Sequence, residues 1–302
     1  MGEERGDRSV VKKAVIPAAG YGTRLFPATK AIKKEFFPVV DREGRAKPLI
    51  LAIAEEALSA GIESIGIVVQ ASDRPLFEDF FKTEPTGDYR AKLLPKYADE
   101  LDALLAIGQR ITMLTQDTQD GFGHAVYCAA DWVAGEPFLL MLGDHVYRSN
   151  RSDSCARQIV DAYQTVGMSV IGVEAAPITD CTHRGCVTGR WRSGSSSLLD
   201  ITEIYEKPTV EYAQQNLRME GLSDEHVLAA SGLYLLPPEI FRYLEDDIRH
   251  DRRDRGEFQL TTCLESLRRD RGIAAYLVNG RSFDVGQPQY YRQTIMGYGL
   301  PE

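Results

Sequence analysis

A short glycine-containing loop near the start of the chain has the composition of a phosphate-binding loop. The apolar segment 14–19 predicts a buried strand, and Gly20-Tyr-Gly22-Thr23-Arg24 follows it directly. Small residues let backbone N–H groups approach a phosphate, and an arginine guanidinium can bind two of its oxygens. The spacing does not fit a dinucleotide motif, because Leu25 stands where the third glycine is needed, and no P-loop Gly-Lys-Ser/Thr is present. The loop alone is equally compatible with a tight turn.

Basic residues are concentrated around this loop, although the chain as a whole is acidic. Residues 12–47 contain nine Lys or Arg and three Asp or Glu, a local charge of +6, whereas the whole chain has a net charge of −9. Binding to duplex nucleic acid needs an extended basic face, so nucleic acid is excluded as the expected partner. One concentrated basic segment suits a small polyanion, although such charges are also common on solvated loops.

Length and composition describe an ordinary globular chain. Its 302 residues are 43% hydrophobic and 26% charged, which excludes a disordered, collagen-like or coiled-coil protein. No apolar run approaches the roughly 18–20 residues of a membrane helix, and residues 1–13 lack the apolar segment of a secretion signal. We therefore expect a soluble, cytoplasmic protein with a mobile polar tail at residues 1–12.

The five cysteines are scattered along the chain and are odd in number. This pattern fits reduced thiols in a cytosol better than a disulfide framework. Cys181-Thr-His183-x-x-Cys186 has no second ligand pair at a suitable spacing, and a structural zinc site needs four ligands. The cysteines are expected to be packing residues.

Strand-like and helix-like segments alternate in the first half of the chain. The expected strands there cover 14–19, 62–70, 111–115 and 137–142; the expected helices cover 48–60 and 123–133, with a partly irregular helical stretch at 72–110. Later strands are expected at 169–174, 185–191, 199–206 and 228–236, and closing helices at 238–247, 257–269 and 288–298. The alternation predicts an α/β fold with a doubly wound, mainly parallel mixed sheet.

Polar residues follow three of the expected strands. In open α/β sheets ligands bind outside the carboxyl ends of the strands, which is where the segment 20–24, Gln116 and Asp144 fall. Since no change in composition marks a domain boundary, we expect one two-lobed domain over residues 13–302.

The longer sequence around the glycine loop resembles one enzyme family. Gly20-Tyr-Gly-Thr-Arg-Leu-Phe-Pro-Ala-Thr-Lys-Ala-Ile-Lys-Lys34-Glu35-Phe-Phe-Pro38, then Lys47-Pro48-Leu49-Ile50, closely resembles the opening of the bacterial UTP–glucose-1-phosphate uridylyltransferases, which are sugar-nucleotide pyrophosphorylases. Similar segments follow in order over residues 13–299: Gln116, Gly121–Val126, Leu142–Asp144, Arg184–Val187, Glu206–Pro208, Ser231–Tyr234, Gly256–Thr261 and Phe283–Gly286.

The resemblance implies a Rossmann-like nucleotidyltransferase fold and a reaction between two phosphate-bearing substrates. UTP and glucose 1-phosphate would give UDP-glucose and pyrophosphate, with the nucleotide bound by the half at about 13–147 and the sugar by the half at about 148–302. It also implies a homo-oligomer that binds neither nucleic acid nor membranes. No general base is needed, because the attacking phosphate oxygen is already an anion near pH 7, so charge neutralisation and positioning dominate.

The resemblance also implies a role for individual residues. The implied catalytic residues are Arg24, Lys34, Asp144 and Lys207. The implied nucleotide-binding residues are Ala19, Gly20, Gly22, Thr23, Glu35, Gln116 and Gly121. The implied sugar-binding residues are Gly185, Glu206 and Lys207, and Glu257 and Gln259 contact the sugar or order a lid. Asp144 and Asp284 would hold Mg²⁺, a hard cation that prefers carboxylate oxygens.

Three departures from the family pattern leave the identity of both substrates open. Lys33 stands where the family usually has proline, residues 42–46 are inserted before Lys47, and Gly143-Asp144-His145 replaces the common Pro-Asp-Val. A sister enzyme that uses dTTP or another sugar 1-phosphate is the nearest alternative, although the Lys34-Glu35 pair favours the uridylyl group. A non-catalytic sugar-nucleotide-binding protein is disfavoured because the implied catalytic and metal residues are all present together.

Overall fold

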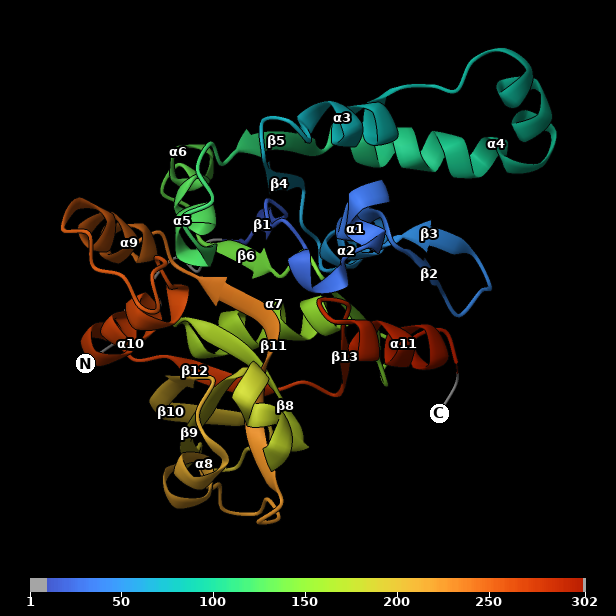
Figure 1. Cartoon of the computed structure of the whole chain (residues 1–302). Helices are drawn as coiled ribbons and strands as arrows, with labels where there is room; N and C mark the ends of the chain where they lie inside the picture. Colours follow the sequence, from blue (N-terminus) through green and yellow to red (C-terminus); the bar gives the residue numbers. More distant parts are fainter. Residues whose placement is uncertain (1–9, 301–302) are drawn as a thin grey trace, which may run out of the picture.

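The computed structural model describes residues 10–300, which form a central β-sheet with helices on both faces (Figure 1). The strands are β1 (Lys13–Pro17), β2 (Pro38–Val40), β3 (Ala46–Pro48), β4 (Ser64–Val69), β5 (Ile111–Thr115), β6 (Phe138–Met141), β7 (His145–Ser149), β8 (Val170–Pro177), β9 (Gly185–Trp191), β10 (Leu198–Glu206), β11 (His226–Leu236), β12 (Ala274–Leu277) and β13 (Gly280–Asp284). Residues 1–9, most of the expected polar tail, and residues 301–302 lie outside the described part.

Helices connect most of these strands. They are α1 (Ala28–Ala31), α2 (Leu49–Ser59), α3 (Arg74–Lys82), α4 (Gly87–Gln109), α5 (Phe122–Tyr127), α6 (Ala130–Val133), α7 (Cys155–Val166), α8 (Val210–Asn216), α9 (Ile240–Arg249), α10 (Leu260–Arg271) and α11 (Pro288–Gly297). Three 3₁₀ turns cover Thr23–Leu25, Lys34–Phe36 and Ile178–His183. Among residues 10–300, none of the helices combines the length and the apolar character that crossing a bilayer requires.

The main sheet is mixed. Within the described residues it has nine strands in the order β5-β4-β1-β6-β11-β8-β12-β10-β9. The first four strands in this order pair in parallel, but β11 runs antiparallel to both β6 and β8, and β10 is antiparallel to β12 and β9. β11 also pairs with β9, which partly closes the sheet. The α/β class and the mixed sheet are confirmed, but the sheet is not mainly parallel, because β11 and β10 pair antiparallel with their neighbours.

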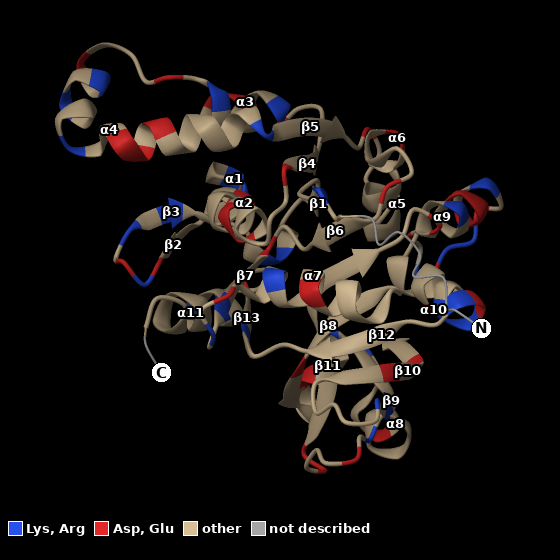
Figure 2. Cartoon of the chain, turned by 180° about the vertical axis from the view of Figure 1, so that it is seen from behind, with Lys and Arg blue, Asp and Glu red and all other residues tan. Residues whose placement is uncertain are grey.

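Both faces of the sheet are buried, and β1 shows how the sequence produces this. Ala14 and Ile16 pack on the side of α2 and α7, while Val15 packs on the opposite side with α5, α9 and α10. All three side chains are fully buried. A strand covered on both faces is expected to be continuously apolar rather than alternating, which is the pattern of segment 14–19. Charged side chains lie on the outer helices and loops, and central strands such as β6 carry none (Figure 2).

Two small antiparallel ribbons lie outside the main sheet and were not predicted. β2 pairs with β3, and β7 pairs with β13. The inserted residues 42–46 form the turn and the first strand residue of the β2–β3 hairpin, where the Asp41 carboxylate accepts a hydrogen bond from the Arg45 backbone N–H at 2.8 Å. The β7–β13 ribbon places Asp284 directly opposite His145.

The sequence patterns predicted most strands of the main sheet correctly but missed or misplaced several helices. The strand expected at 111–115 matches β5, and the helix expected at 48–60 matches α2. The single helix expected at 123–133 is wrong, because the chain breaks it into α5 and α6 around Cys128 and Ala129. Helices α7 and α8 and strand β12 were also missed.

Glu56 is a largely buried carboxyl on α2 that caps the N-terminus of α7. Its Oε1 accepts a hydrogen bond from the Ala156 backbone N–H at 2.8 Å. Burial disfavours the ionised form and raises the pKa of Glu56 to about 7, even though this hydrogen bond lowers it. The folded chain therefore holds a proton on Glu56 that the unfolded chain releases near pH 4.5.

We expect the free energy of unfolding to decrease as the pH rises from about 4.5 to 7, because in this range ionisation of Glu56 favours only the unfolded chain. Its share of the decrease is at most about 3 kcal/mol. Urea denaturation at pH 5 and pH 8 measures the difference. Glu56→Gln should reduce the pH dependence, and an unchanged dependence in that variant would contradict the assignment.

Candidate active site

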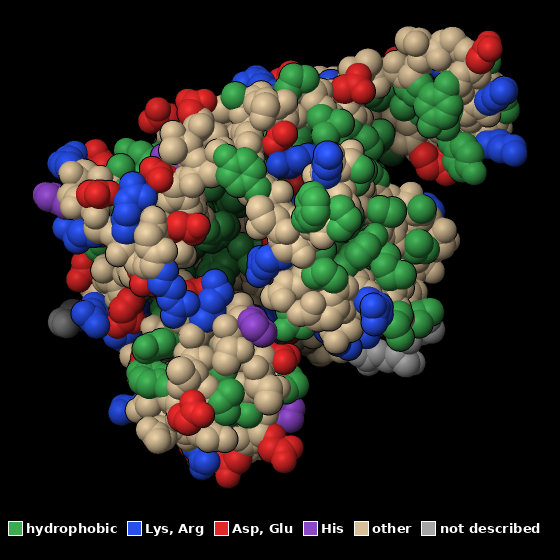
Figure 3. Space-filling model, in the orientation of Figure 1, with side chains coloured by type: hydrophobic (Ala, Val, Ile, Leu, Met, Phe, Trp, Pro, Cys, Tyr) green, Lys and Arg blue, Asp and Glu red, His purple; other side chains and the backbone are tan. Residues whose placement is uncertain are grey.

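A cleft of about 590 Å³ opens where the carboxyl ends of the N-terminal strands face β9–β11 and α10. Figure 3 shows it as a dark hollow in the middle of one face, with basic side chains at its rim. Every residue singled out from the sequence lines this cleft: Ala19, Gly20, Gly22, Thr23, Arg24, Lys34, Glu35, Gln116, Gly121, Asp144, Gly185, Glu206, Lys207, Glu257, Gln259 and Asp284. His145, His183, Arg184, Tyr234 and Thr261 also line it and had not been assigned a role.

The glycine loop leaves β1 and turns back over the cleft. Gly22 has a φ of +66°, and its carbonyl accepts a hydrogen bond from the Thr29 hydroxyl at 3.1 Å. A left-handed residue is needed here because the 3₁₀ turn that carries Arg24 starts directly afterwards. The Arg24 side chain is exposed, and no ion pair to another described residue holds it. It is therefore free to bind an anion.

Lys34 and Glu35 lie deeper in the cleft, on the next 3₁₀ turn. Lys34 Nζ donates to Asp144 Oδ2 at 2.7 Å and lies 3.6 Å from Glu35 Oε1. Burial by itself lowers the pKa of Lys34, but the charges of Asp144 and Glu35 outweigh it and raise the pKa. Glu35 is fully buried, and neither carboxyl oxygen has a hydrogen-bond partner among the described residues. Burial raises its pKa to about 7 despite the nearby ammonium of Lys34.

Asp144, His145 and Asp284 form a compact group of three side chains. One ligand atom from each lies within 4.8 Å of the other two. His145 Nδ1 is 3.0 Å from Asp144 Oδ1, and the Gly286 backbone N–H donates to Asp284 Oδ1 at 2.5 Å. Burial by itself raises the pKa of Asp144, but Lys34 and His145 lower it well below the usual range. An ionised carboxylate, a second carboxylate and an imidazole are a donor set that fits a divalent metal ion.

One end of the cleft carries Gln116 and Gly121. Gln116 follows β5, is 3% exposed, and its Nε2 donates to the Gly121 carbonyl at 3.2 Å. Gly121 has a φ of +106°, and a Cβ there would lie 2.7 Å from the Phe258 carbonyl oxygen. Only glycine fits at this position, which brings the backbone before α5 close to the cleft.

The opposite end carries Gly185, Glu206 and Lys207. Gly185 pairs with Glu206 across β9 and β10, and a Cβ on Gly185 would come within 3.2 Å of Glu206 Oε2. That oxygen accepts a hydrogen bond from the Thr261 hydroxyl at 2.9 Å. Successive residues of a regular strand point to opposite faces, so Glu206 and Lys207 could not both reach the cleft from within one. They reach it here because β10 ends at Glu206 and Lys207 has a φ of +49°.

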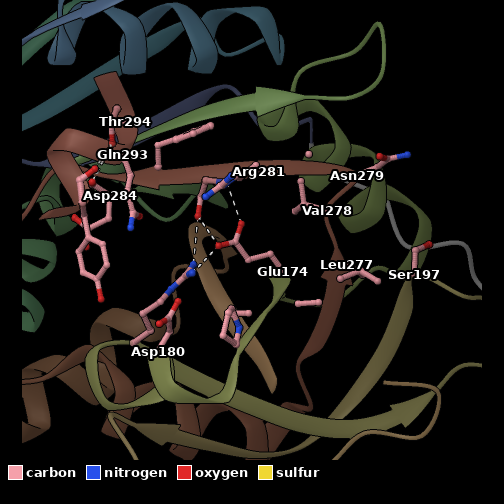
Figure 4. A pocket seen from close by; sticks show the side chains of 18 residues that line it. Glu174, Asp180, Ser197, Leu277, Val278, Asn279, Arg281, Asp284, Gln293 and Thr294 are labelled. Atoms are coloured by element: carbon pink, nitrogen blue, oxygen red, sulfur yellow. Dashed lines mark hydrogen bonds and ion pairs between the residues drawn. The ribbon is translucent and has the colours of Figure 1, made fainter. Parts of the chain in front are cut away.

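A second cavity of about 650 Å³ lies beside the cleft, along β8 and β13 (Figure 4). Arg184 lines both, and Glu174 of β8 bonds to Arg184 and to Ser282 of β13. Glu174 Oε1 accepts from Arg184 Nη1 and from the Ser282 hydroxyl, and its Oε2 accepts from the Ser282 backbone N–H at 2.9 Å. Arg184 also donates to the Ala230 carbonyl of β11 at 2.7 Å. This network fixes β13, which ends at Asp284 in the cleft.

Only part of the basic segment 12–47 contributes to the cleft. Arg24 and Lys34 line it. Lys13 instead forms an ion pair with Glu136, and Lys47 is held between Asp41 and Glu55. Two residues of the segment are therefore placed where they could bind a polyanion, whereas Lys13 and Lys47 form ion pairs within the fold.

The arrangement suits an elongated ligand with negative charge in its middle. The centre of the cleft holds cationic side chains and the group of Asp144, His145 and Asp284. At one end lie the Gln116 amide and the backbone of Gly121. At the other end the Glu206 carboxylate lies beside the Lys207 ammonium. Phosphates fit the centre, a base edge fits the amide, and hydroxyl groups fit the carboxylate.

Comparisons with known proteins agree with this geometry. The sequence matches the nucleotidyl transferase family over residues 13–299. A curated relative from Staphylococcus epidermidis, named UTP–glucose-1-phosphate uridylyltransferase, is 34% identical over 97% of this chain and 93% of its own length. A crystal structure of UDP-glucose pyrophosphorylase complexed with UDP-glucose has a TM-score of 0.76 and 30% identity, covering 95% of this chain and 98% of that one. A UTP-bound enzyme from Acinetobacter baumannii has a TM-score of 0.75 and 29% identity, covering 96% and 94%. The chain belongs to the nucleotidyl transferase family.

Proposed function

We propose that the chain transfers a uridylyl group from UTP to glucose 1-phosphate, giving UDP-glucose and pyrophosphate. The observation that carries the proposal is the convergence, in one cleft, of Arg24 and Lys34 from the N-terminal segment with Asp144 and Asp284 from opposite halves of the chain. The relatives named for this activity, and the neighbouring structures described with UTP or UDP-glucose, support these two substrates.

The reaction is a substitution at the α-phosphorus of UTP. A phosphate oxygen of glucose 1-phosphate forms the new P–O bond, and the bond to the β-phosphate breaks on the opposite side, so that pyrophosphate leaves. No proton has to move. Arg24 binds the triphosphate and the charge that develops on pyrophosphate, and Lys34 binds near the α-phosphate. A Mg²⁺ ion held by Asp144 and Asp284 would neutralise charge on the phosphate oxygens.

The two ends of the cleft select the two substrates. In the nucleotide-binding half, about 13–147, Gln116 offers the acceptor and donors that the O4/N3–H edge of uracil requires, and Gly121 admits the base. The loop residues Ala19, Gly20, Gly22 and Thr23, together with Glu35, surround the nucleotide. In the sugar-binding half, about 148–302, Glu206 accepts hydrogen bonds from sugar hydroxyls, Lys207 binds the sugar phosphate and Gly185 leaves room for the ring. Glu257 and Gln259, which line the same cleft, contact the sugar or order a lid over it.

Glu206→Ala should raise the KM for glucose 1-phosphate more than the KM for UTP, because the carboxylate contacts only the sugar. The loss should be on the order of 10–100-fold in kcat/KM for the sugar phosphate, the equivalent of one to two charge-assisted hydrogen bonds. Initial rates with each substrate varied in turn measure the two KM values. If the KM for UTP rose more, the sugar end would be misassigned.

The test of the function is pyrophosphate release in Mg²⁺, with UTP, dTTP, ATP, CTP and GTP each combined with several sugar 1-phosphates. Turnover is expected with UTP and glucose 1-phosphate and should disappear in excess chelator. Turnover only with another pair would keep the mechanism and replace the substrates. A folded protein that binds UDP-glucose but shows no turnover with any pair would contradict an enzymatic role.

Family resemblance also supports three broader proposals. These are a single two-lobed domain over 13–302, a homo-oligomeric assembly and a cytoplasmic location. Light scattering of the purified chain would give the oligomeric state.

A further inference from the structure

We propose that His145 is a third ligand of the metal site, which therefore binds Mn²⁺ or Co²⁺ in preference to Mg²⁺. This proposal takes one assumption from the proposed function, namely that a divalent ion binds at Asp144 and Asp284. It adds a nitrogen donor to an otherwise all-oxygen protein site. Imidazole suits transition ions, whereas Mg²⁺ favours carboxylates, water and phosphates.

Strand register brings His145 to the metal site. In the β7–β13 ribbon His145 lies directly opposite Asp284. Residues directly opposite in an antiparallel pair project from the same face, with Cβ atoms about 4.5–5.5 Å apart. The side chain of His145 is 10% exposed and lines the cleft. His145 and Asp284 therefore both line the cleft from the same ribbon.

Asp144 reaches the same point although it is the neighbour of His145 in the chain. Successive residues of a strand point to opposite faces, so both could not face one ion within a regular strand. Asp144, however, lies in the turn before β7, where the His145 backbone N–H donates to the Leu142 carbonyl at 3.4 Å. The Val285 N–H donates to the Asp144 carbonyl at 2.8 Å, which ties this turn to the end of β13.

The distance between His145 Nδ1 and Asp144 Oδ1 matches that of two ligands of one ion, and Asp284 lies close enough to complete the group. Two ligands at right angles, each about 2.1 Å from an ion, are about 3.0 Å apart, and opposite ligands are about 4.2 Å apart. His145 Nδ1 and Asp144 Oδ1 are 3.0 Å apart, and all three ligand atoms lie within 4.8 Å of one another. Lys34 holds Asp144 Oδ2, while Asp144 Oδ1 shares a hydrogen bond with His145 Nδ1, so an ion bound here would replace that hydrogen bond with one contact to each side chain.

Gly286 makes this close approach possible. A Cβ at this position would lie 2.9 Å from Asp284 Oδ1, 3.2 Å from Asp144 Oδ2 and 3.3 Å from the Arg24 guanidinium. The backbone N–H of Gly286 fixes the orientation of the Asp284 carboxylate. Hydrogen bonds that orient ligands in this way are typical of metal sites.

The test is the coordination of Mn²⁺ added alone to the purified protein, measured by electron spin-echo envelope modulation. Wild type should show the ¹⁴N coupling of a directly bound imidazole, and His145→Asn should lose it because an amide supplies oxygen instead. His183→Asn is the matched control, since His183 lines the same cleft outside the three-residue group, and it should keep the signal.

Competition between Mn²⁺ and Mg²⁺ gives an independent readout. The preference for Mn²⁺ should fall on the order of tenfold in His145→Asn and stay unchanged in His183→Asn. Absence of bound nitrogen in wild type, or an unchanged preference in His145→Asn, would show that His145 only hydrogen-bonds to Asp144 and would overturn the proposal. Because both measurements are made without nucleotide or turnover, they remain decisive even if the proposed substrates are wrong.

Discussion

Asp144→Asn is expected to lower kcat on the order of 10²–10³-fold or more while the fold is retained. The replacement keeps the size of the side chain but removes the charge that binds Lys34 Nζ at 2.7 Å and faces His145 at 3.0 Å. Under the proposed mechanism it therefore weakens the metal site and releases the ammonium that acts at the α-phosphate. Pyrophosphate release at saturating UTP and glucose 1-phosphate, with circular dichroism for the fold, measures the effect.

Asp200→Asn is the matched control for this change. Asp200 forms an ion pair with Arg192 on the outer part of β10, its side chain is 58% exposed, and it does not line the cleft. An exposed pair of this kind contributes at most about 1 kcal/mol, so turnover should not change. A rate near that of the wild type in Asp144→Asn would remove Asp144 from the catalytic machinery.

Glu174→Ala should lower the free energy of unfolding by about 3–5 kcal/mol, because it leaves the largely buried Arg184 guanidinium without its charge partner. The side chains of Arg184 and Glu174 are only 20% and 15% exposed. The change also removes the acceptor for the Ser282 backbone N–H in β13. Urea denaturation measures the stability. Since β13 ends at Asp284, kcat should also fall.

Glu174→Gln separates charge from hydrogen bonding in this network. The amide oxygen can still accept from the Ser282 N–H, so β13 should keep its position and the loss of stability should be smaller than in Glu174→Ala. Equal stability of Glu174→Ala and wild type would mean that the network of Glu174, Arg184 and Ser282 does not hold β13 in place.

The sequence was informative where a signal is local. The apolar segments 14–19 and 62–70 predict strands and segment 48–60 predicts a helix, and the structure has all three within a few residues. The direction in which β11 runs through the sheet could not be predicted, because a buried strand has the same apolar pattern whether it pairs in parallel or antiparallel. The position of β11 between β6 and β8 depends on contacts made across the whole chain.

The site shows the same division. Roles could be predicted for Arg24, Lys34, Gln116 and Asp144 because each lies in a segment that resembles the family, and all four line the cleft. None could be predicted for His145, because its role depends on the pairing of β7 with β13, and both strands are short and of mixed polarity. The one available signal was that the chain departs from the family pattern at this residue.

The β7–β13 ribbon also sets the order of events during synthesis. Strand β7 leaves the ribosome well before β13, and α11, which packs on β13, follows later still. The N-terminal strands can pair as soon as they are made, but Asp144 and His145 cannot meet Asp284 until residue 284 has been added. A nascent chain therefore has its whole glycine loop long before Asp144, His145 and Asp284 can come together, and a chain that stops before residue 284 lacks this group altogether.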